Sequence, residues 1–422
     1  MAFAFKKIEK IFRDSKIQMN ILFVTENEIS PIQGGTERIT HTLSREFMAL
    51  GHQCSLLYYI PAAKDLTVSY FSAKLALDLS GNIDSQISSF LNENRIEVVI
   101  VNFVRYSSKK QILPILYKEA STLGAKVIVC FHAMPGEDMI GTSLLNVFYR
   151  LVHRYDQKQA LKDLTNAALP KSVSNLLFGK RIREKYRLSI DNCDRFVLLS
   201  EEFYKPYCEL AGIDDIAKFR AVPNALSFAD VIHEDKLEEK QNRVLIVARM
   251  HERSKRLSMA FKIWKLVEKD PSLNNWHLDI VGGGPDSLYF RKLVRFNGLK
   301  RCHLLGRQPE IDEFYENSSI FMMTSAFEGF GITLIEAQQN AVVPIAFNSY
   351  ASLKDIIVTG ENGVIVPNND VDAFYHALKS LMLDEEKRLQ MAKFGLKSCL
   401  AFSQKEITAK WIKIIDELTN NK

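Results

Sequence analysis

Two glutamates on either side of a glycine-rich turn carry the strongest chemical signal in the sequence. Glu328 and Glu336 lie in the segment SAFEGFGITLIEA, which follows a short apolar run. Gly329 and Gly331 let the backbone turn tightly and approach a ligand closely, because glycine has no Cβ. A helix that begins near Ile332 offers its first N–H groups to an anion. The pattern predicts a phosphate at the helix start and two carboxylates that accept hydrogen bonds from hydroxyl groups.

Two cations and a second glycine turn are expected at the same edge of a sheet. Arg249 and Lys255 lie in ARMHERSKRL after the apolar run RVLIVA, and the turn VGGGP around Gly283 follows the run HLDIV. Because the carboxyl ends of parallel strands share one edge, these cations would neutralise a diphosphate on the helix start. Taken alone, each piece has a plainer explanation: solvated surface cations, a loop acid, and a helix acid favoured by the helix dipole.

The first half of the chain offers a histidine and a glycine at strand ends. His132 follows the run KVIVCF, and Gly35 closes the loop SPIQGG that follows the run NILFV. An imidazole at a strand end either donates to or accepts from a sugar hydroxyl or phosphate, or is a loop residue satisfied within the protein. The residues alone leave both alternatives open.

The elements that position these residues are short apolar runs alternating with helical patterns, which is typical of parallel sheets covered on both faces. Before Pro223 the predicted strands are 20–25, 97–102, 126–131 and 195–200, with a helix over 36–50. Later strands are predicted at 243–248, 277–281, 303–305, 320–323, 342–346 and 363–366. Helices are predicted over 255–268, 285–297, 311–316, 334–340, 370–383 and 403–418, with a linker over 223–242. The fold class is therefore α/β, with two doubly wound sheets and ligands beyond the carboxyl ends of their strands.

The composition is that of an ordinary globular protein. The 422 residues are 47% hydrophobic, 25% charged and 10% aromatic, which excludes a disordered chain or a disulfide-stapled module. The 55 basic and 50 acidic residues leave a net charge of +5, too small for a dedicated nucleic-acid binder. The six scattered cysteines are predicted to be single buried thiols. The lack of a membrane-spanning run or a signal-peptide core predicts a cytoplasmic location.

Together these motifs resemble the retaining glycosyltransferases of the GT-B fold, specifically glycosyltransferase family 4, the glycosyl transferases group 1. The resemblance runs over most of the chain and rests on PIQGGTER, VPNA, ARMHERSKR, IVGGGP, FEGFGITLIE and GENG, with Gly51-His52 and Gly306. It implies two Rossmann-like domains facing a central cleft. An N-terminal acceptor domain would span 19–222 and be completed by a terminal helix over 403–420. A nucleotide-sugar donor domain would span 223–402, and residues 1–18 would form an extension.

The resemblance assigns catalytic roles to four residues. Arg249 and Lys255 would hold the diphosphate and stabilise it as the leaving group. Glu328 would hold the hydroxyls of the donor sugar, and His132 would contact that sugar near the reaction centre. The family pattern has glycine where this chain has Ala248 and Arg256, and the stretch 137–191 has no clear match. The first two departures leave the charges intact and concern the subfamily rather than the activity.

The donor-binding residues follow from the same resemblance. Glu336 would bind the ribose hydroxyls of the nucleotide, and Gly35 would border the phosphates from the other lobe. Gly306 and Arg307 lie where such enzymes hold the base. The remaining expected donor-binding residues are Gly283, Gly329, Phe330, Gly331, Ile332 and Thr333.

The expected reaction needs neither metal nor cofactor, because two cations and a helix start can stabilise the departing diphosphate. Neither an Asp-x-Asp after a strand nor a His/Cys cluster points to a metal. The family implies a uridine-linked donor sugar and a glycan or lipid-linked acceptor. The basic amphipathic stretch 143–187 and the leader 1–18 would suit an anionic membrane surface, or equally a core-packed helix with a solvated face and a frayed extension.

Two other functions stay under consideration. One is a different two-lobed sugar-phosphate enzyme, such as a phosphorylase or a nucleotide-sugar epimerase. The other is a non-catalytic, glycosyltransferase-like partner subunit. The partner-subunit hypothesis would be favoured by loss of the cations or carboxylates, but Arg249, Lys255, Glu328 and Glu336 are all present.

Overall fold

The computed structural model describes residues 18–30, 35–62, 67–102, 106–140, 171–228 and 231–419, with residues 147, 148, 151 and 161. They fall into two compact units. The first gathers residues from 1–135, 178–227 and 401–422, and the second gathers residues from 136–177 and 228–400. The structure divides the chain into its units after residues 227 and 400, whereas the sequence predicted domain boundaries after residues 222 and 402.

A seven-stranded parallel sheet forms the centre of the first unit. Its strand order is β3-β2-β1-β4-β5-β6-β7. The strands are β1 (Asn20–Val24), β2 (Gln53–Tyr58), β3 (Lys74–Ala76), β4 (Val98–Val101), β5 (Lys126–Phe131), β6 (Arg195–Leu198) and β7 (Phe219–Ala221). The described helices include α2 (Gly35–Ala49), α3 (Ile83–Glu93), α4 (Tyr106–Thr122), α7 (Lys171–Asp191), α8 (Tyr204–Ala211) and the short η3 (Glu201–Phe203). The strand order reverses between β1 and β4, so the loops that leave these two strands flank the switch point where such sheets bind ligands.

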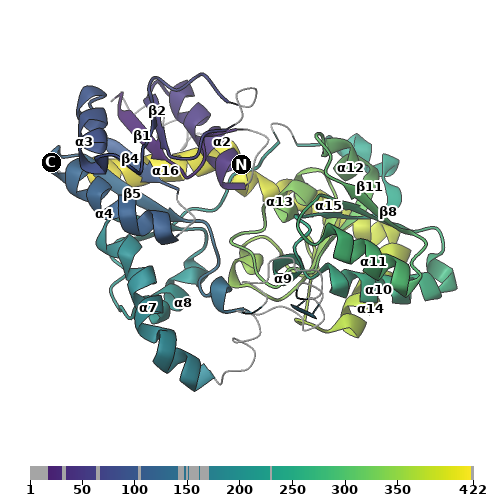
Figure 1. Cartoon of the computed structure of the whole chain (residues 1–422). Helices are drawn as coiled ribbons and strands as arrows, with labels where there is room; N and C mark the ends of the chain where they lie inside the picture. Colours follow the sequence, from purple (N-terminus) through teal and green to yellow (C-terminus); the bar gives the residue numbers. More distant parts are fainter. Residues whose placement is uncertain are drawn as a thin grey trace. The chain divides into compact units, whose positions relative to one another are not determined.

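The last helix of the chain completes the first unit. In Figure 1 this helix, α16 (Gln404–Thr419), is drawn in yellow beside the purple and blue elements of the first unit. Its buried Ile407, Trp411 and Ile415 share one hydrophobic cluster with Phe23 of β1 and Phe47 of α2. Each such buried side chain contributes about 1.5–3 kcal/mol. The helix and its apolar face, both predicted from the sequence, are confirmed.

A six-stranded parallel sheet forms the centre of the second unit, in the order β10-β9-β8-β11-β12-β13. The strands are β8 (Gln241–Val247), β9 (His277–Val281), β10 (Cys302–Gly306), β11 (Ser318–Met323), β12 (Val343–Phe347) and β13 (Val364–Val366). The α-helices are α9 (Glu252–Lys255), α10 (Leu257–Lys269), α11 (Ser287–Asn297), α12 (Asp312–Asn317), α13 (Ile332–Gln339), α14 (Val371–Leu383) and α15 (Glu385–Ser398). Short 3-10 helices are η2 (Glu137–Met139), η4 (Glu234–Glu239), η5 (Pro271–Leu273), η6 (Ala351–Asp355) and η7 (Cys399–Phe402). This sheet has its switch point between β8 and β11.

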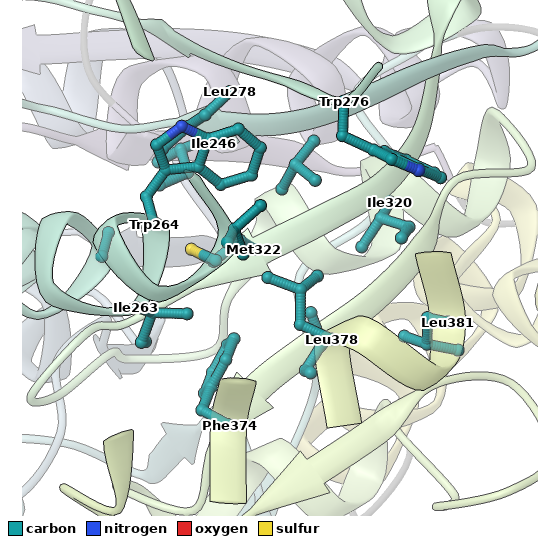
Figure 2. Packing of buried hydrophobic residues seen from close by; sticks show 14 of the residues in the cluster. Ile246, Ile263, Trp264, Trp276, Leu278, Ile320, Met322, Phe374, Leu378 and Leu381 are labelled. Carbon is teal, nitrogen blue, oxygen red and sulfur yellow. The ribbon is translucent and has the colours of Figure 1, made fainter. Parts of the chain in front are cut away.

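The core of the second unit lies between its sheet and the helices α10 and α14. Figure 2 shows Trp264 of α10 and Phe374 and Leu378 of α14 among the strand residues Leu278 and Met322. All five side chains are buried in one cluster. This packing fixes the strands, and therefore fixes where the loops at their carboxyl ends begin.

The predicted elements are largely confirmed, with differences that have local causes. The helix expected over 255–268 is two helices, because Arg256 between α9 and α10 has a left-handed backbone with φ +45°. The predicted linker contains η4, and β8 begins inside it at Gln241. Strands β2, β3 and β7 and helices α8 and α15 were not predicted. Polar Gln53 and Ser55 interrupt the apolar run of β2, which is why its pattern is weak.

Two predictions about the chain as a whole can be compared with the structure. All six cysteines are free, as predicted, and five of them are buried, whereas Cys208 is only half-buried. Across the ranges that the structure describes, no helix combines the length and apolarity needed to cross a membrane. The prediction of a basic, membrane-binding surface falls largely outside those ranges, because they contain none of the basic residues of 143–162 and only Gln18 of the leader 1–18.

Candidate active site

The loops that follow β8 and β11 flank the switch point of the second sheet, and they carry most of the predicted site. These two strands are neighbours in the sheet. The loop after β8 leads into α9 with Arg249 and Lys255, and the loop after β11 leads through Glu328 into α13. Backbone bonds join the two loops directly, since the N–H of Ala326 donates to the Ser254 carbonyl at 2.7 Å. The sequence prediction that these residues share one edge of the sheet is therefore confirmed.

Lys255 and Glu328 form an ion pair within this edge. The Lys255 Nζ lies 2.5 Å from Glu328 Oε1, and the two side chains are 20% and 15% exposed. The Ser325 hydroxyl donates to the same carboxylate oxygen at 2.5 Å. The Thr324 hydroxyl donates to the Lys255 carbonyl at 2.9 Å. The ammonium has three donors, so pairing with one carboxylate leaves it able to bind further acceptors.

Arg256, directly after Lys255 in the chain, forms hydrogen bonds with the other loops at this edge of the sheet. Its guanidinium donates to the carbonyls of Thr324 at 2.9 Å and Ser325 at 2.7 Å. It also donates to the side-chain oxygens of Asn368 and Asn369, at 3.0 and 2.5 Å. Burial lowers the pKa of Arg256 to about 10, which still leaves it charged at neutral pH. The sequence singled this residue out only as a departure from the family pattern.

The short helix α9 is fixed by buried carboxylates that sequence reasoning missed. Glu252 is 2% exposed and accepts hydrogen bonds from the hydroxyl and the N–H of Ser258, the second residue of α10. The backbone N–H of Glu252 donates to Asp286 Oδ2 at 2.7 Å. Burial, with a smaller effect of Asp286, raises the pKa of Glu252 to about 7. A single acidic letter in a charged segment gives no sequence signal for such burial.

The turn VGGGP packs against the strand exit that carries Arg249. A Cβ on Gly282 would lie 2.0 Å from the Ala248 carbonyl oxygen, and one on Gly284 would lie 2.5 Å from the Met250 carbonyl oxygen. Both positions therefore require glycine for this close approach. The Arg249 side chain between these contacts is exposed to solvent.

Gly283, Gly306 and Arg307 lie together at the neighbouring strand exits. The N–H of Gly282 donates to the Gly306 carbonyl at 2.8 Å, which joins the loops after β9 and β10. A Cβ on Gly283 would lie 3.7 Å from the Cβ of Arg307, so these two positions are in contact range. Arg307 is exposed, and an exposed cation beside a glycine turn leaves room for a bound group.

The start of α13 is shaped by Gly331, which has a left-handed backbone with φ +98°. A Cβ at this position would lie 2.6 Å from the Tyr350 hydroxyl. Burial, and to a smaller degree Glu328, raises the pKa of Tyr350 well above its usual value, so this hydroxyl stays neutral. Ile332 and Thr333 are the first residues of the helix, and their N–H groups have no partner within the helix geometry.

Contacts with neighbouring segments hold the loop residues that precede α13 in place. The carbonyl of Gly329 accepts a hydrogen bond from the Ser352 hydroxyl at 3.2 Å, and Phe330 is buried. Phe327 stacks under the guanidinium of Arg253, 5.5 Å from the ring centre. Arg253 also donates to the carbonyls of Glu137 and Ile140 at 2.8 Å. Residues 136–140 accordingly group with the second unit, although the sequence placed them in the first lobe.

Glu336 lies in the second turn of α13 and is 1% exposed. Its Oε2 accepts a hydrogen bond from the Tyr315 hydroxyl at 3.0 Å. A buried carboxylate is costly unless it is hydrogen-bonded, so Tyr315 is part of what keeps Glu336 in place. Tyr315 was not singled out in the sequence.

The first unit holds His132 and Gly35 at the carboxyl edge of its own sheet. His132 follows β5 and lies with its Nε2 3.0 Å from Asn102 Oδ1, and Asn102 follows β4. The Asn102 amide donates to the Thr40 hydroxyl of α2 at 2.9 Å. Gly35 is the exposed first residue of α2, and residues 31–34 of the predicted phosphate-bordering loop lie outside the described residues.

Within each unit the structure thus gathers the predicted residues at one sheet edge. Arg249, Lys255, Glu328 and the start of α13 share the edge of the second sheet, while His132 and Gly35 share the edge of the first. Among the residues that the structure describes, no cluster of three His, Cys, Asp or Glu side chains could hold a metal ion. The arrangement supplies cations and helix N–H groups, which suit an anionic ligand such as a diphosphate.

Comparisons with known proteins agree with this geometry. Residues 229–398 match the family model described as glycosyl transferases group 1. An uncharacterized glycosyltransferase of Haemophilus influenzae is 22% identical over 360 residues, which is 85% of this chain and 90% of that protein. The GalNAc-alpha-(1->4)-GalNAc-alpha-(1->3)-diNAcBac-PP-undecaprenol alpha-1,4-N-acetyl-D-galactosaminyltransferase of Campylobacter jejuni is 27% identical over 234 residues. That match covers 56% of this chain and 63% of the relative's length.

A solved structure extends the comparison to the whole fold. The Anabaena protein HepE in complex with UDP superposes with a TM-score of 0.67 at 14% identity, covering 94% of this chain and all of that one, 100%. At this identity the likeness concerns the fold, and it agrees with the two parallel sheets described above. The second unit therefore carries the match to the glycosyl transferases group 1, and the chain as a whole has the GT-B fold of two parallel-sheet domains.

Proposed function

We propose that this protein transfers a sugar from a UDP-linked donor to a glycan, polysaccharide or lipid-linked acceptor, with retention of the anomeric configuration and without a metal ion. The match of residues 229–398 to the glycosyl transferases group 1 and the Campylobacter relative support glycosyltransfer in polysaccharide or glycoconjugate biosynthesis. The donor sugar is proposed to be a hexose or an N-acetylhexosamine. The observation that carries the proposal is the Lys255–Glu328 pair at the switch point of the second sheet.

The chemistry follows from where charge develops. The bond between the anomeric carbon and the diphosphate oxygen breaks, a bond to the acceptor oxygen forms, and the proton of the acceptor hydroxyl passes to the departing diphosphate. Negative charge then grows on the diphosphate, where Lys255, Arg249 and the N–H groups of Ile332 and Thr333 would stabilise it. These groups supply the positive charge that a metal ion provides in other transferases, which is the basis for proposing a metal-independent reaction.

The remaining residues bind the donor. Glu336, held by Tyr315, would accept hydrogen bonds from the ribose hydroxyls, and Glu328 would accept them from the donor sugar. His132 would contact the donor sugar from the first unit. Gly35, Gly283, Gly306, Arg307, Gly329, Phe330 and Gly331 would line the nucleotide and the phosphates. UDP is supported by the solved structure of the UDP-bound relative, whose fold this chain shares.

A lipid-linked acceptor and a peripheral membrane contact are proposed together. The Campylobacter relative's name includes an undecaprenol-linked acceptor. Within the described part of 143–187, α7 presents exposed Lys180, Arg181, Arg183 and Arg187. Such a basic face attracts an anionic lipid surface. The protein would then act at the cytoplasmic face of a membrane.

The test is a donor assay with UDP-hexoses and UDP-N-acetylhexosamines. We expect UDP release with at least one donor, undiminished by a chelator, and a product with the donor's anomeric configuration in proton NMR spectra. Release that requires inorganic phosphate would favour a phosphorylase, and conversion of the sugar while still attached to UDP would favour an epimerase. Binding of UDP without turnover of any donor would favour the non-catalytic partner subunit.

A further inference from the structure

Arg256 is an unusual residue for the backbone position that it occupies. Its φ of +45° lies in the left-handed region, which residues with a Cβ adopt at a cost that glycine avoids. The position separates α9 from α10, where it also caps α9 by donating its N–H to the Glu252 carbonyl at 2.9 Å. A glycine would serve this turn with less strain. The side chain must therefore contribute something that offsets the strained backbone.

The guanidinium of Arg256 joins the ends of four neighbouring strands. It starts from the segment after β8 and donates to the Thr324 and Ser325 carbonyls after β11. It lies over the ring of Phe347 at the end of β12, 5.5 Å from the ring centre. It also donates to Asn368 and Asn369, which follow β13. One side chain thus spans the switch point between β8 and β11.

These contacts act on the loop that carries Glu328. Thr324 and Ser325 directly precede it, and Ser325 itself donates to Glu328 through its hydroxyl. Lys255 is the neighbour of Arg256 in the chain, so the same residue anchors both partners of the ion pair. The hydrogen-bond partners of the guanidinium are carbonyl and amide oxygens, which give a fixed geometry to its planar set of donors.

We propose that Arg256 is a positioning residue for sugar transfer: its guanidinium fixes the loop after β11 against α9, so that Lys255 and Glu328 keep the separation that the reaction requires. The proposal rests on the proposed function, in which these two residues act on the leaving diphosphate and the donor sugar. Contacts at a reaction centre tolerate little displacement, and loss of a supporting side chain typically lowers activity about 10- to 100-fold.

The test compares Arg256→Gly, which relieves the backbone, with Arg256→Lys, which keeps the charge but loses the planar fork. We expect Arg256→Gly to lower kcat about 10-fold or more while the donor KM changes less than about 3-fold, because the affected contacts strengthen as charge develops. Arg256→Lys is expected to recover part of kcat. A wild-type kcat in Arg256→Gly overturns the proposal, and so does a loss that appears only in KM.

Arg301 supplies a matched control in the same unit. Its guanidinium also donates to three backbone carbonyls, those of Val267, Leu273 and Trp276, but these lie before β9, at the opposite edge of the sheet. Arg301→Ala removes a comparable set of bonds and is expected to lower Tm while leaving kcat near that of wild type. An equal loss of kcat in both variants would mean that Arg256 acts through general stability, and it would overturn the proposal.

Two further measurements keep the proposal testable. In the background of Lys255→Ala, Arg256→Gly is expected to cost less activity than it costs in the wild type, because one of the two residues that Arg256 positions is already gone. Fully additive losses would contradict the proposal. Hydrogen exchange of 324–331 is expected to be faster in Arg256→Gly but not in Arg301→Ala, and unchanged exchange would contradict the proposal. This readout needs no turnover, so it separates failure of the proposal from failure of the proposed function. If Arg256→Gly does not fold, Arg256→Asn serves, because asparagine tolerates the left-handed region.

Discussion

The Lys255 ammonium lies 2.5 Å from the Glu328 carboxylate, although the two residues belong to loops that leave different strands. The pair stands where the order of the second sheet reverses, between β8 and β11. A cation and an anion held together in a part-buried site can each exchange its partner for a ligand group that makes the same kind of hydrogen bond. A diphosphate would take the place of Glu328 beside Lys255, and sugar hydroxyls would take the place of Lys255 beside Glu328.

Removal of Lys255 is expected to slow the reaction strongly. Lys255→Ala deletes one of the charges proposed to stabilise the leaving diphosphate, and we expect turnover to fall at least ~100-fold. The measurement is the initial rate of UDP release under saturating donor. The control is Lys379→Ala, because Lys379 forms an ion pair of the same length, 2.5 Å, with Asp270 between α10 and η5. Similar rates in both variants would contradict a role for Lys255 in the reaction.

Tyr315→Phe is expected to weaken nucleotide binding through Glu336. The variant deletes the hydroxyl that donates to the buried Glu336 carboxylate, which costs about 1–3 kcal/mol of folding free energy. We expect a lower Tm and an affinity for UDP that is about 10-fold weaker by calorimetry. Tyr375→Phe removes a similar bond, from a tyrosine to Asp270 at 2.7 Å, and should leave UDP affinity unchanged. Unchanged affinity in Tyr315→Phe would argue against Glu336 as a ribose ligand.

The stability of the second unit should depend on pH through Glu252. Burial raises the pKa of Glu252 to about 7 from 4.5, so between these values the folded state holds a proton that the unfolded chain has released. The favourable contribution of protonated Glu252 to the free energy of unfolding is therefore fully present below about pH 4.5. It is lost as the pH rises to about 7. The glutamine in Glu252→Gln cannot ionise. The free energy of unfolding of this variant should therefore rise relative to that of wild type by on the order of 2 kcal/mol between pH 5 and pH 8.

The measurement for Glu252 is the unfolding midpoint of the second unit in both proteins across this pH range. The difference between variant and wild type is the informative quantity, because other groups titrate equally in both. Parallel curves for the two proteins would show that Glu252 is ionised throughout, and would contradict the expected effect of its burial.

The contacts of His132 predict which of its ring nitrogens carries the proton. The Thr40 hydroxyl donates to the Thr36 carbonyl at 2.8 Å, so towards Asn102 it accepts from the amide NH2. The amide oxygen of Asn102 then faces His132 Nε2, which must donate. If the Asn102 amide were flipped, its oxygen would face the Thr40 hydroxyl, whose proton is already donated to the Thr36 carbonyl, and one hydrogen bond would be lost. We expect the neutral imidazole to be protonated on Nε2 in nitrogen-15 NMR spectra of the side chain, and protonation on Nδ1 would contradict this network.

The two parallel sheets could be predicted from the sequence because buried parallel strands require short runs of apolar residues. The runs VVIV in β4 and IFMM in β11 are buried along their whole length, and this burial requires the apolar residues from which the strands were predicted. The edge of the sheet at which chemistry occurs then follows from strand direction. For the same reason Lys255 and Glu328 could be expected on one edge, although the ion pair between them could not.

The rest depends on contacts between residues far apart in the chain. Arg256 has the sequence properties of an ordinary helix former, but the structure gives it a left-handed backbone and hydrogen bonds to the distant carbonyls of Thr324 and Ser325. Glu252 has the sequence context of a surface acid within a charged segment, but in the structure it is buried and bonded to Ser258 and Asp286. Neither outcome has a local signal, because both are decided by what the fold brings to these positions.

The nucleotide site is tested most directly by hydrogen exchange of the whole protein with and without UDP. We expect UDP to protect 249–256, 282–284, 306–307 and 324–336, which together form the carboxyl edge of the second sheet, with the strongest protection at the start of α13. Binding of UDP that protects other segments and leaves these four unchanged would contradict this expectation.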